Sequence, residues 1–433
     1  MKIKSWGMHP LVDSETFTLE NSNKLSKYIS KNKSFIPFGN GRSYGDSALY
    51  KRILLCKNYN QIIKFDENLG ILECQSGVLL SEIIEHCIEK GWFLKITPGT
   101  KLITVGGAIA SDIHGKNHHK DGCFSECVEE FTLMLPDDGK IIKCSKKLNS
   151  ELFFATCGGM GLTGVILSAR IKLKKVNSIF INQRTIKSKN LKDTFQAFEN
   201  QSDQPYSVAW IDCLSKGNKL GRSVLMVGDF ANDGILKYKK GFKLNLPFNF
   251  PSFFISKWTV KLFNFFYYNF LNSHDSIKKV NFDSFFYPLD KINNWNRMYG
   301  KNGFTQYQFI LPKETSYEGL KEILNAISRS GKGSFLAVLK LYGSANKNFL
   351  SFPMEGYSLA LDFKIEPGLF QLLDQLDELV LKFNGRIYLS KDVRVPKKVF
   401  EIGYPLIENF RDIRKSYKMK QKIKSFQSIR LDI

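Results

Sequence analysis

The sequence predicts an α+β fold with two domains, for three reasons. At 433 residues, the chain is too long for a single hydrophobic core and suits two domains of ordinary size. Up to residue 175, short strand patterns alternate with turns, and the segment is rich in glycine. After Val176 the glycine density falls, and longer strands and amphipathic helices are expected. A second domain should therefore start near residue 176.

In the first domain, local patterns predict short strands and one helix. Residues Ile62–Phe65 and Ile71–Gln75 have strand composition and flank a turn that ends at Gly70. A helix should begin at Ser81, because the apolar residues that follow share one helical face and Gly91 comes after its end. The remaining strand patterns are the hairpin Phe131–Leu135 with Lys140–Cys144, joined by Pro136–Gly139, and the alternating segment Gly164–Lys174.

The second domain is expected to carry amphipathic helices. Apolar residues at helical spacing run from Leu320 to Ile327 and again from Leu369 to Val380. The segment Arg411–Lys424 is dense in Lys and Arg with interspersed apolar residues. We interpret it as a solvated helix face, with a phosphate-facing role as the alternative.

The composition is that of a globular protein with a strongly basic surface. The hydrophobic fraction is 43% and the charged fraction 24%. The formal net charge of +22 fits nucleic acid, an anionic membrane or phosphate-bearing substrates, although a lysine-rich proteome would produce the same surface. Because no nucleic-acid-binding motif is present, we expect no nucleic-acid partner.

Cysteine and histidine patterns do not predict a metal site. The eight cysteines form no Cys-x-x-Cys pair, and scattered cysteines indicate reduced thiols. His118 and His119 are adjacent, but no suitably spaced carboxylate or cysteine completes a ligand set. Met1–Val12 has no apolar run. We therefore expect no metal and no signal peptide.

One segment has membrane-like composition. Leu246–Leu271 holds eight Phe, one Trp and two Tyr, but Lys257 and Lys261 interrupt it and two prolines stand near its start. It is a poor transmembrane span. Aromatic residues mixed with lysine suit a helix lying in the membrane interface, and a buried cap helix or an aromatic loop is the alternative.

Three glycine-rich segments predict an extended ligand. They are Gly39–Asp46, the pair Thr97–Thr100 and Thr104–Gly107, and Gly158–Gly164. Glycine lets backbone amides approach a ligand closely, and successive amides form a nest for pyrophosphate oxygens. Three such loops favour a dinucleotide. The spacing is not that of a Rossmann fingerprint, and no Walker lysine follows.

These motifs, in this order, resemble the decaprenylphosphoryl-β-D-ribose 2′-oxidase family of the vanillyl-alcohol oxidase and p-cresol methylhydroxylase (PCMH) superfamily. The most specific segment is Asp112–His119, with His114 and Lys116. The resemblance extends along nearly the whole chain, through Gly41–Asp46, Thr104–Ala110, Gly161–Gly164, Tyr206–Asp212, Trp295–Arg297, Gln306–Phe309, Lys340–Gly343, Leu350–Pro353 and Gly385–Asp392.

The resemblance implies a vanillyl-alcohol-oxidase-type flavoprotein. A PCMH-type FAD-binding domain would span residues 1–175 and a substrate-binding cap, built on an antiparallel sheet with helices, residues 176–384. Residues 385–433 would return to the FAD domain. Many superfamily members attach FAD through a histidine in the first loop, where this chain has Tyr44. We therefore expect non-covalent FAD.

The implied cofactor-binding residues lie in the glycine-rich loops and near the flavin ring. They are Gly39, Asn40, Gly41, Arg42, Ser43, Tyr44, Gly45, Asp46, Gly99, Thr104, Val105, Gly106, Gly107, His114, Gly115, Lys116, Asn117, Val165 and Tyr388.

The resemblance also implies catalytic and substrate-binding residues. The catalytic candidates are Lys391, His114, Gln308 and Lys116, and the substrate-binding candidates are Lys116, Lys340, Gln308, Gln306, Trp210, Asp362 and Phe286. Oxidation of a sugar hydroxyl needs a proton acceptor, and a fixed cation can stabilise the charge that develops on the flavin. Lys391 is the first candidate to stabilise that charge or to orient the reacting hydroxyl, and Lys116 and Lys340 are the next candidates. Lys391 could accept the proton if burial or neighbouring cations lowered its pKa towards neutrality. His114 is the alternative proton acceptor.

The implied reaction is oxidation of the 2′-hydroxyl of a polyprenyl-phosphoryl-β-D-ribose to a ketone, the first half of an epimerisation to the arabinose form. A short-chain reductase would complete the epimerisation. Ala360 and Phe286 stand where mycobacterial members carry cysteine and tyrosine, which leaves the sugar and lipid length open. The alternatives are a soluble alditol or aldonolactone oxidase of the same superfamily and a non-catalytic nucleic-acid-binding protein. We expect a cytoplasmic protein, or one peripheral to the inner face of the plasma membrane.

Overall fold

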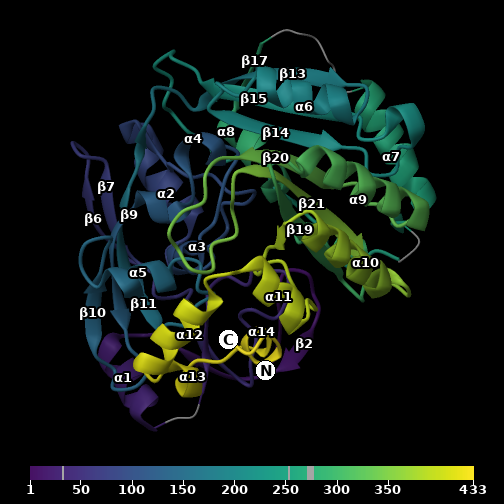
Figure 1. Cartoon of the computed structure of the whole chain (residues 1–433). Coiled ribbons are helices and arrows are strands. Elements are labelled where there is room, and N and C mark those ends of the chain that lie inside the picture. Colours follow the sequence, from purple (N-terminus) through teal and green to yellow (C-terminus); the bar gives the residue numbers. More distant parts are fainter. Residues whose placement is uncertain (32–33, 252–253, 271–276) are drawn as a thin grey trace.

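The computed structural model describes residues 1–31, 34–251, 254–270 and 277–433. Figure 1 shows a sheet with flanking helices at the upper right and smaller sheets at the lower left, with both termini close together below. Leu271, Ser252 and Phe253 of the aromatic segment lie outside the described residues. The predicted α+β class is confirmed.

Two sheets organise the first part of the chain. The larger has the order β10-β9-β11-β7-β6 with all neighbours antiparallel. The smaller has the order β3-β5-β4 and is parallel. Their strands are β3 (Glu15–Thr18), β4 (Ile36–Phe38), β5 (Arg52–Leu55), β6 (Ile62–Asp66), β7 (Ile71–Gln75), β9 (Val128–Met134), β10 (Ile141–Cys144) and β11 (Val165–Lys172).

The helices of this part are short. The predicted helix after Ser81 is present as α2, it continues in a 3-10 turn at Ile88–Lys90, and Gly91 ends it with a φ of 78°. That left-handed conformation favours glycine. The helices are α1 (Ser22–Lys31), α2 (Leu80–Cys87), α3 (Val105–Ala110), α4 (His118–Asp121) and α5 (Ser150–Thr156).

The second part is built on an antiparallel sheet of eight strands, in the order β17-β13-β15-β14-β20-β21-β19-β22. These are β13 (Phe180–Ser188), β14 (Tyr206–Ile211), β15 (Ser223–Phe230), β17 (Lys278–Asn281), β19 (Phe304–Pro312), β20 (Ala337–Tyr342), β21 (Gly356–Lys364) and β22 (Arg386–Ile387). The short strands β1 (Lys2–Lys4) with β2 (Leu11–Asp13), β8 (Trp92–Phe93) with β12 (Lys174–Lys175), and β16 (Leu244–Asn245) with β18 (Ile292–Asn293) form separate pairs.

Helices α6 (Leu191–Asn200), α9 (Ser316–Ser330) and α10 (Leu369–Lys382) cover one face of the eight-stranded sheet, and the opposite face is turned toward the first part (Figure 1). In β20, the buried Ala337 and Leu339 alternate with the less buried Val338 and Lys340. The apolar set packs under the helices, so the other set faces inward. The helices of this part are α6 (Leu191–Asn200), α7 (Lys257–Phe270), α8 (Phe282–Phe286), α9 (Ser316–Ser330) and α10 (Leu369–Lys382).

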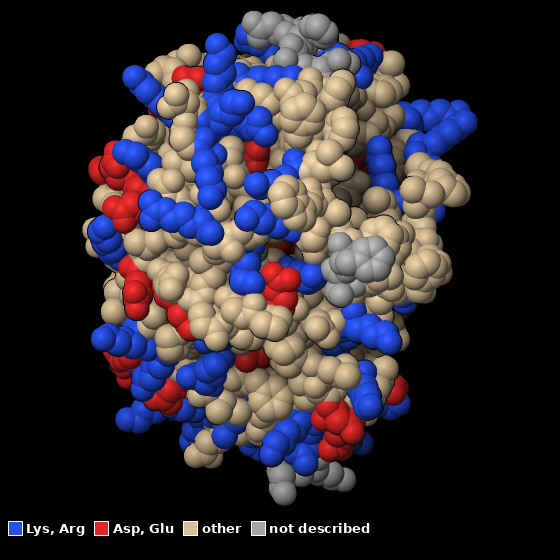
Figure 2. All heavy atoms as spheres, turned by 90° about the vertical axis from the view of Figure 1, so that its right-hand side faces the viewer, with Lys and Arg blue, Asp and Glu red and all other residues tan. Residues whose placement is uncertain are grey.

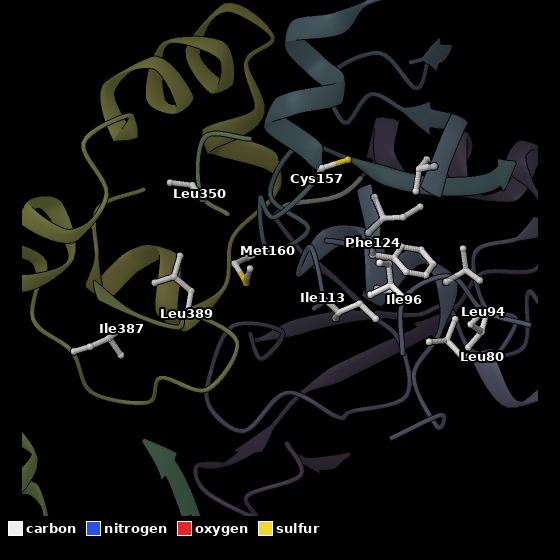
Figure 3. Packing of buried hydrophobic residues seen from close by; sticks show 14 of the residues in the cluster. Leu80, Leu94, Ile96, Ile113, Phe124, Cys157, Met160, Leu350, Ile387 and Leu389 are labelled. Atoms are coloured by element: carbon white, nitrogen blue, oxygen red, sulfur yellow. The ribbon is translucent and has the colours of Figure 1, made fainter. Parts of the chain in front are cut away.

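The C-terminal segment lies beside the first sheets. It contains α11 (Lys397–Gly403), α12 (Ile407–Ser416), α13 (Met419–Lys422) and α14 (Phe426–Arg430). Figure 3 shows Leu389 and Leu350 approaching Met160 in one continuous core. Arg414 departs from the expected solvated face, because it is 1% exposed and donates hydrogen bonds to the carbonyls of Leu162 and Ile423.

The proposed division at residues 175 and 384 stays a prediction. Strand β22 pairs with β19, so residues 386–387 belong to the eight-stranded sheet.

All eight cysteines are buried and free. Among the described residues, no helix is both long and apolar enough to cross a membrane.

Candidate active site

A cavity of about 950 Å³ and a groove of about 110 Å³ adjoin each other. Arg42, Ser43, Gly107 and Ser111 line both, so the two form one elongated site. The groove lies against the first glycine-rich loop and α3, whereas the cavity reaches the inner face of the eight-stranded sheet. An elongated site of this kind suits a dinucleotide at one end and a substrate at the other.

The groove has the features of a pyrophosphate cradle. Gly41 has a φ of 59° and Gly161 a φ of 75°, both favouring glycine, and a Cβ on Gly161 would meet no atom within 4 Å. Thr104 Oγ1 accepts the Gly107 amide at 3.1 Å and fixes the start of α3. Ser76 Oγ lines the groove and has no hydrogen-bond partner among the described residues. These residues fit the diphosphate part of FAD.

Most predicted cofactor-binding residues line this site. The groove is lined by Gly39, Asn40, Gly41, Arg42, Ser43, Thr104, Gly106, Gly107 and Val165, and the cavity by Arg42, Ser43, Tyr44, Gly99, Gly107, His114, Lys116 and Tyr388. Five others line neither space: Gly45, Asp46, Val105, Gly115 and Asn117.

Those five residues support the loops that form the wall. A Cβ on Gly45 would lie 1.7 Å from the Asp392 carbonyl oxygen, so the two backbones pack directly together. Asp46 pairs with Arg430 at 2.9 Å, and Asn117 donates hydrogen bonds to the Lys95 carbonyl and Asp121. Val105 is fully buried in the core. A Cβ on Gly115 would lie 2.7 Å from the Thr97 carbonyl oxygen.

Four of the predicted substrate residues share the inner face of three neighbouring strands: Gln306, Gln308, Lys340 and Asp362. Gln306 pairs in register with Asp362, and Gln308 with Ala360. Lys340 stands opposite Ser358 on the next strand pair. Because side chains alternate along a strand, residues two apart face the same cavity. Gln306, Gln308, Lys340, Trp210, Phe286 and Ala360 all line it; Asp362 lies just behind and accepts a hydrogen bond from Gln306 Nε2 at 2.6 Å.

His114 lies at the meeting point of the two parts. Gln308 Nε2 is 3.1 Å from His114 Nε2, and the rings of Tyr342 and Tyr388 each have centroids 5.0 Å from the imidazole. Burial and the neighbouring Lys340 hold the pKa of His114 well below its usual value. The imidazole is therefore neutral near pH 7. When the Gln308 amide donates, Nδ1 carries the ring proton and has no partner among the described residues.

Lys391 stands over the ring of Tyr44, with Nζ 4.0 Å from the ring centroid. Burial lowers the pKa of Lys391 to about 7, against an opposing effect of Asp362. Burial raises the pKa of Asp362 to about 7. A neutral amine is therefore accessible near pH 7, which is the condition for a proton acceptor.

Lys116 and Lys340 add two further amines to the cavity. Lys116 Nζ donates a hydrogen bond to the Phe285 carbonyl and lies 5.0 Å from the Phe285 ring centroid. Burial, followed by the charge of Lys340, lowers the pKa of Lys116 to about 7. Burial lowers the pKa of Lys340 to about 8. These cations can attract an anionic substrate group, although burial limits how many are charged together.

Several residues in or beside the cavity were not singled out from the sequence. Trp6, Asp290 and Ser358 line it, and Tyr342 lies next to His114. Tyr342 lies 3.4 Å from Gln308 through its hydroxyl, and Ser358 is 3.3 Å from the same amide. Strand alternation from Lys340 and Ala360 could have found both. Asp290 accepts hydrogen bonds from Thr100 and the Lys101 amide, and Arg42 lies 4.0 Å from the Trp6 ring centroid. These distant pairs have no local sequence signal.

Within the described residues, no group of three or more His, Cys, Asp and Glu side chains could hold a metal ion. His119 instead contacts the Gln204 carbonyl at 2.8 Å, and His118 Nδ1 accepts the Gly343 amide at 3.1 Å. Both histidines therefore connect α4 to neighbouring segments.

The fold and the site define a FAD-dependent oxidoreductase, and residues 18–145 match the FAD binding domain family. The chain is 36% identical over 397 residues to decaprenylphosphoryl-β-D-ribose oxidase from Mycolicibacterium smegmatis, covering 89% of this chain and 86% of that protein. The chain belongs to the decaprenylphosphoryl-β-D-ribose oxidase family. The predicted family and the FAD cofactor are confirmed.

Two other relatives show how far the similarity extends. A Streptomyces coelicolor protein, named as an uncharacterised protein in the mprA 5′ region, is 26% identical over 78% of this chain and 95% of its own length. Mouse L-gulonolactone oxidase is 27% identical over 33% of this chain and 32% of its own length. Similarity to the aldonolactone oxidase is thus confined to a third of the chain.

Proposed function

We propose that the protein oxidises the 2′-hydroxyl of a polyprenyl-phosphoryl-β-D-ribose to the 2′-keto sugar, the first half of an epimerisation to the arabinose form. The observation that carries the proposal is the 36% identity to the mycolicibacterial oxidase across 89% of the chain. That extent includes the eight-stranded sheet, whose inner face supplies Gln308, Lys340 and Trp210 to the cavity. An overlap of this extent supports a shared substrate-facing wall.

Bound FAD supplies a hydride acceptor for the sugar carbon. The protein must orient the hydroxyl and accept its proton. We assign the proton to Lys391 Nζ, because its pKa of about 7 makes a neutral amine available. Gln308 and His114 face the same space, 3.1 Å apart, and orient the reacting sugar. His114 is the alternative acceptor, since burial keeps its imidazole neutral.

The remaining polar groups hold the substrate. Lys116 and Lys340 place two amines in the cavity wall, where they can pair with the substrate phosphate. Gln306, held by Asp362 at 2.6 Å, adds a fixed amide. Trp210 and Phe286 provide flat apolar surfaces for the first isoprene units. Phosphate recognition and an apolar wall are what a sugar carried on a lipid phosphate requires.

We propose that the FAD is non-covalent because Tyr44 occupies the loop position where the linking histidine stands elsewhere in the superfamily. Burial keeps the pKa of the Tyr44 phenol well above its usual value, so its oxygen stays protonated near pH 7. A buried, protonated phenol is a packing group for the ring system rather than a nucleophile.

We further propose a short-chain reductase as partner and a peripheral position at the inner face of the plasma membrane. The ketone product must be reduced to give the arabinose form, which calls for a second enzyme. The net charge of +22 is attracted to the anionic cytoplasmic leaflet. Co-purification of a reductase activity that converts the ketone is the corresponding measurement.

The deciding experiment is an absorption spectrum of the purified protein before and after acid precipitation, followed by anaerobic addition of farnesylphosphoryl ribose. We expect flavin in the supernatant after precipitation, and bleaching of the holoenzyme on addition of the substrate. Flavin that stays in the pellet would overturn the non-covalent assignment. Bleaching with free alditols or aldonolactones, but never with the lipid-linked pentose, would favour the soluble oxidase instead.

A further inference from the structure

Helix α7 has two apolar faces, and only one of them is covered. On the inner face, Val260 and Asn264 are buried, and Asn264 Nδ2 donates to Asp212 Oδ1 at 2.7 Å. Tyr267 packs on Trp210 with ring centroids 4.7 Å apart. These contacts dock the helix onto β14 and the residues that follow it. They explain one apolar face and leave the other without a structural reason.

The outer face carries large apolar side chains in the open. Trp258 is 76% exposed and Phe270 is 68% exposed, with Leu262, Phe265 and Phe266 at least half exposed between them. The spacing from 258 to 262, 265 and 266 is i, i+4, i+7 and i+8, which aligns them on one side of the helix. A contiguous exposed apolar face of this kind marks an interaction surface.

The segment before α7 also carries exposed apolar side chains, and ring contacts from Phe248 through Phe250 to Phe254 lead toward the start of the helix. Phe242 is 84% exposed, and Leu244, Phe248 and Phe254 are also exposed. We call these four residues and the outer face of α7 the aromatic surface. Figure 2 shows this side of the molecule, where tan atoms predominate at the upper right and Lys and Arg atoms lie around them. The aromatic surface therefore comes from two consecutive segments, residues 242–254 and helix α7.

The charged side chains within the segment that carries this surface have one sign. Residues 234–274 contain six lysines and no aspartate or glutamate. Lys257 and Lys261 lie on α7 itself, and Lys261 Nζ is 5.6 Å from the Trp258 ring centroid. A second copy of this chain would bring like charge against like charge. Tryptophan, phenylalanine and lysine together are the composition of helices that lie in a membrane interface.

We propose that the aromatic surface docks onto an anionic lipid bilayer. The outer face of α7 lies among the headgroups with its aromatic side chains below them, and the lysines contact anionic headgroups. The docked orientation is fixed because the inner face of α7 is held by the Asn264 and Tyr267 contacts.

This docking places the active-site cavity at the bilayer. Asn245 of the preceding segment and Tyr267 of α7 both line the cavity, so the surface and the site share two elements. At about 950 Å³, the cavity has the size of a small-molecule site, and a long polyprenyl chain exceeds it. Most of the chain can then stay in the bilayer while the sugar enters. This link to catalysis rests on the lipid-linked substrate proposed above.

The test compares vesicle co-sedimentation of the holoenzyme with that of the triple variant Leu262→Ser, Phe265→Ser and Phe266→Ser. Vesicles contain phosphatidylcholine with or without phosphatidylglycerol. Because the variant removes three apolar side chains from the inserted face, even partial insertion predicts at least about a tenfold loss of binding. The matched control is Ile63→Ser, Leu69→Ser and Ile402→Ser, which changes three exposed apolar residues elsewhere.

A second pair of variants tests the charge. Lys257→Gln with Lys261→Gln should weaken binding to phosphatidylglycerol vesicles and reduce its salt sensitivity, whereas Lys51→Gln with Lys57→Gln should not. Both pairs change exposed lysines. Equal binding of wild type and the serine triple variant would overturn the proposal. Loss of a wild-type dimer in that variant, with no vesicle binding by either protein, would assign the surface to a second copy.

Activity separates the docking from the reaction. The serine variant should oxidise dissolved farnesylphosphoryl ribose at the wild-type rate and a long-chain substrate embedded in vesicles more slowly. If vesicle binding depends on the aromatic surface but neither lipid-linked pentose reduces the flavin, the docking stands and the proposed reaction falls. Equal loss of both activities would show that the substitutions disturb the active site, and would overturn the docking role.

Discussion

Three lysines share one cavity, and the charge of Lys340 lowers the tendency of Lys116 and Lys391 to hold a proton. Burial is the main cause, and it brings the pKa of Lys391 and Lys116 to about 7 and that of Lys340 to about 8. Near neutral pH the cavity therefore holds a mixture of charged and neutral amines. A proton acceptor and a cation for the substrate phosphate can coexist in this arrangement.

Replacing Lys391 with methionine tests its role as the proton acceptor. The neutral amine is the active form, so the rate of flavin reduction should rise with pH through about 7 and then level off. Lys391→Met should lower this rate by about 10² to 10⁴ and remove the inflection. Stopped-flow reduction across pH checks both effects, with the exposed Lys398→Met as control. An unchanged inflection would point to Lys116 or Asp362, whose pKa values also lie at about 7.

Ala360 makes a second residue-scale prediction. All eight native cysteines are buried, and burial raises the pKa of Cys56, Cys74 and Cys87 to about 12. Maleimide should therefore leave the wild-type enzyme active. Ala360 lines the cavity opposite Gln308, so Ala360→Cys should become sensitive to maleimide and be protected by substrate.

The control for that experiment is Ser330→Cys, which adds an exposed thiol away from the cavity. It should react with maleimide without loss of activity. Inactivation of the wild-type enzyme at the same rate as Ala360→Cys would show that a native cysteine is accessible, contrary to the buried positions of all eight.

At the scale of elements, the C-terminal helix α14 holds the loop that carries Lys391. Arg430 at its end pairs with Asp46 at 2.9 Å and with Asp392 at 2.8 Å. Gln427 of the same helix donates to the Leu389 carbonyl at 2.8 Å. The first glycine-rich loop and the Lys391 loop are thereby joined through a helix some 40 residues further along the chain.

Arg430→Met should damage both stability and catalysis. Removing one partner of a buried ion pair leaves two carboxylates without compensation and costs about 3 to 5 kcal/mol. Because Lys391 then loses its fixed position, kcat should fall more than KM changes. Urea unfolding and steady-state kinetics measure the two effects. Arg411→Met, which breaks ion pairs to carboxylates that are 33% and 72% exposed, should cost about 1 kcal/mol or less.

An equal loss of stability in Arg430→Met and Arg411→Met would contradict the proposal that Arg430 holds the first glycine-rich loop and the Lys391 loop together. Arg430→Lys gives a further comparison, because it keeps the charge but loses the planar group that reaches both carboxylates. We expect it to recover part of the stability and less of the activity.

Sequence patterns predicted local elements better than long-range contacts. The helix spacing from Leu369 to Val380 corresponds to α10, and Gly91 ends the helix region after Ser81. Both signals are local. The Thr100 hydrogen bond to Asp290 joins residues 190 positions apart, so no local pattern predicts it. The burial of Arg414 was not predicted either, because nothing in its segment distinguishes it from the neighbouring basic residues. Strand alternation indicates which residues of one strand share a face, but the pairing of β20 with β21 along the cavity followed only from the register, which sequence alone does not give.

For the whole molecule, the buried lysines make unfolding depend on pH. The pKa of Lys340 is about 8 when folded and 10.5 in its ordinary state. Between these pH values the unfolded chain binds more protons than the folded chain. Lys340 therefore lowers the free energy of unfolding most below pH 8, and this effect disappears as the pH rises toward 10.5. The difference of about 2.5 in the pKa lowers the free energy of unfolding by about 3 kcal/mol at most.

Lys340→Met should therefore raise the unfolding free energy of the apoenzyme at pH 7 while lowering its activity when loaded with FAD. The gain over wild type should shrink by about 1.4 kcal/mol for each pH unit above 8. Urea unfolding at pH 7 and pH 9 measures this difference, and comparison within each pH removes effects common to both proteins. The exposed Lys398→Met should show no such trend. A gain in unfolding free energy that does not change with pH would mean that Lys340 is already solvated in the folded cavity. Lys340 would then carry the charge that binds the phosphate before the substrate arrives.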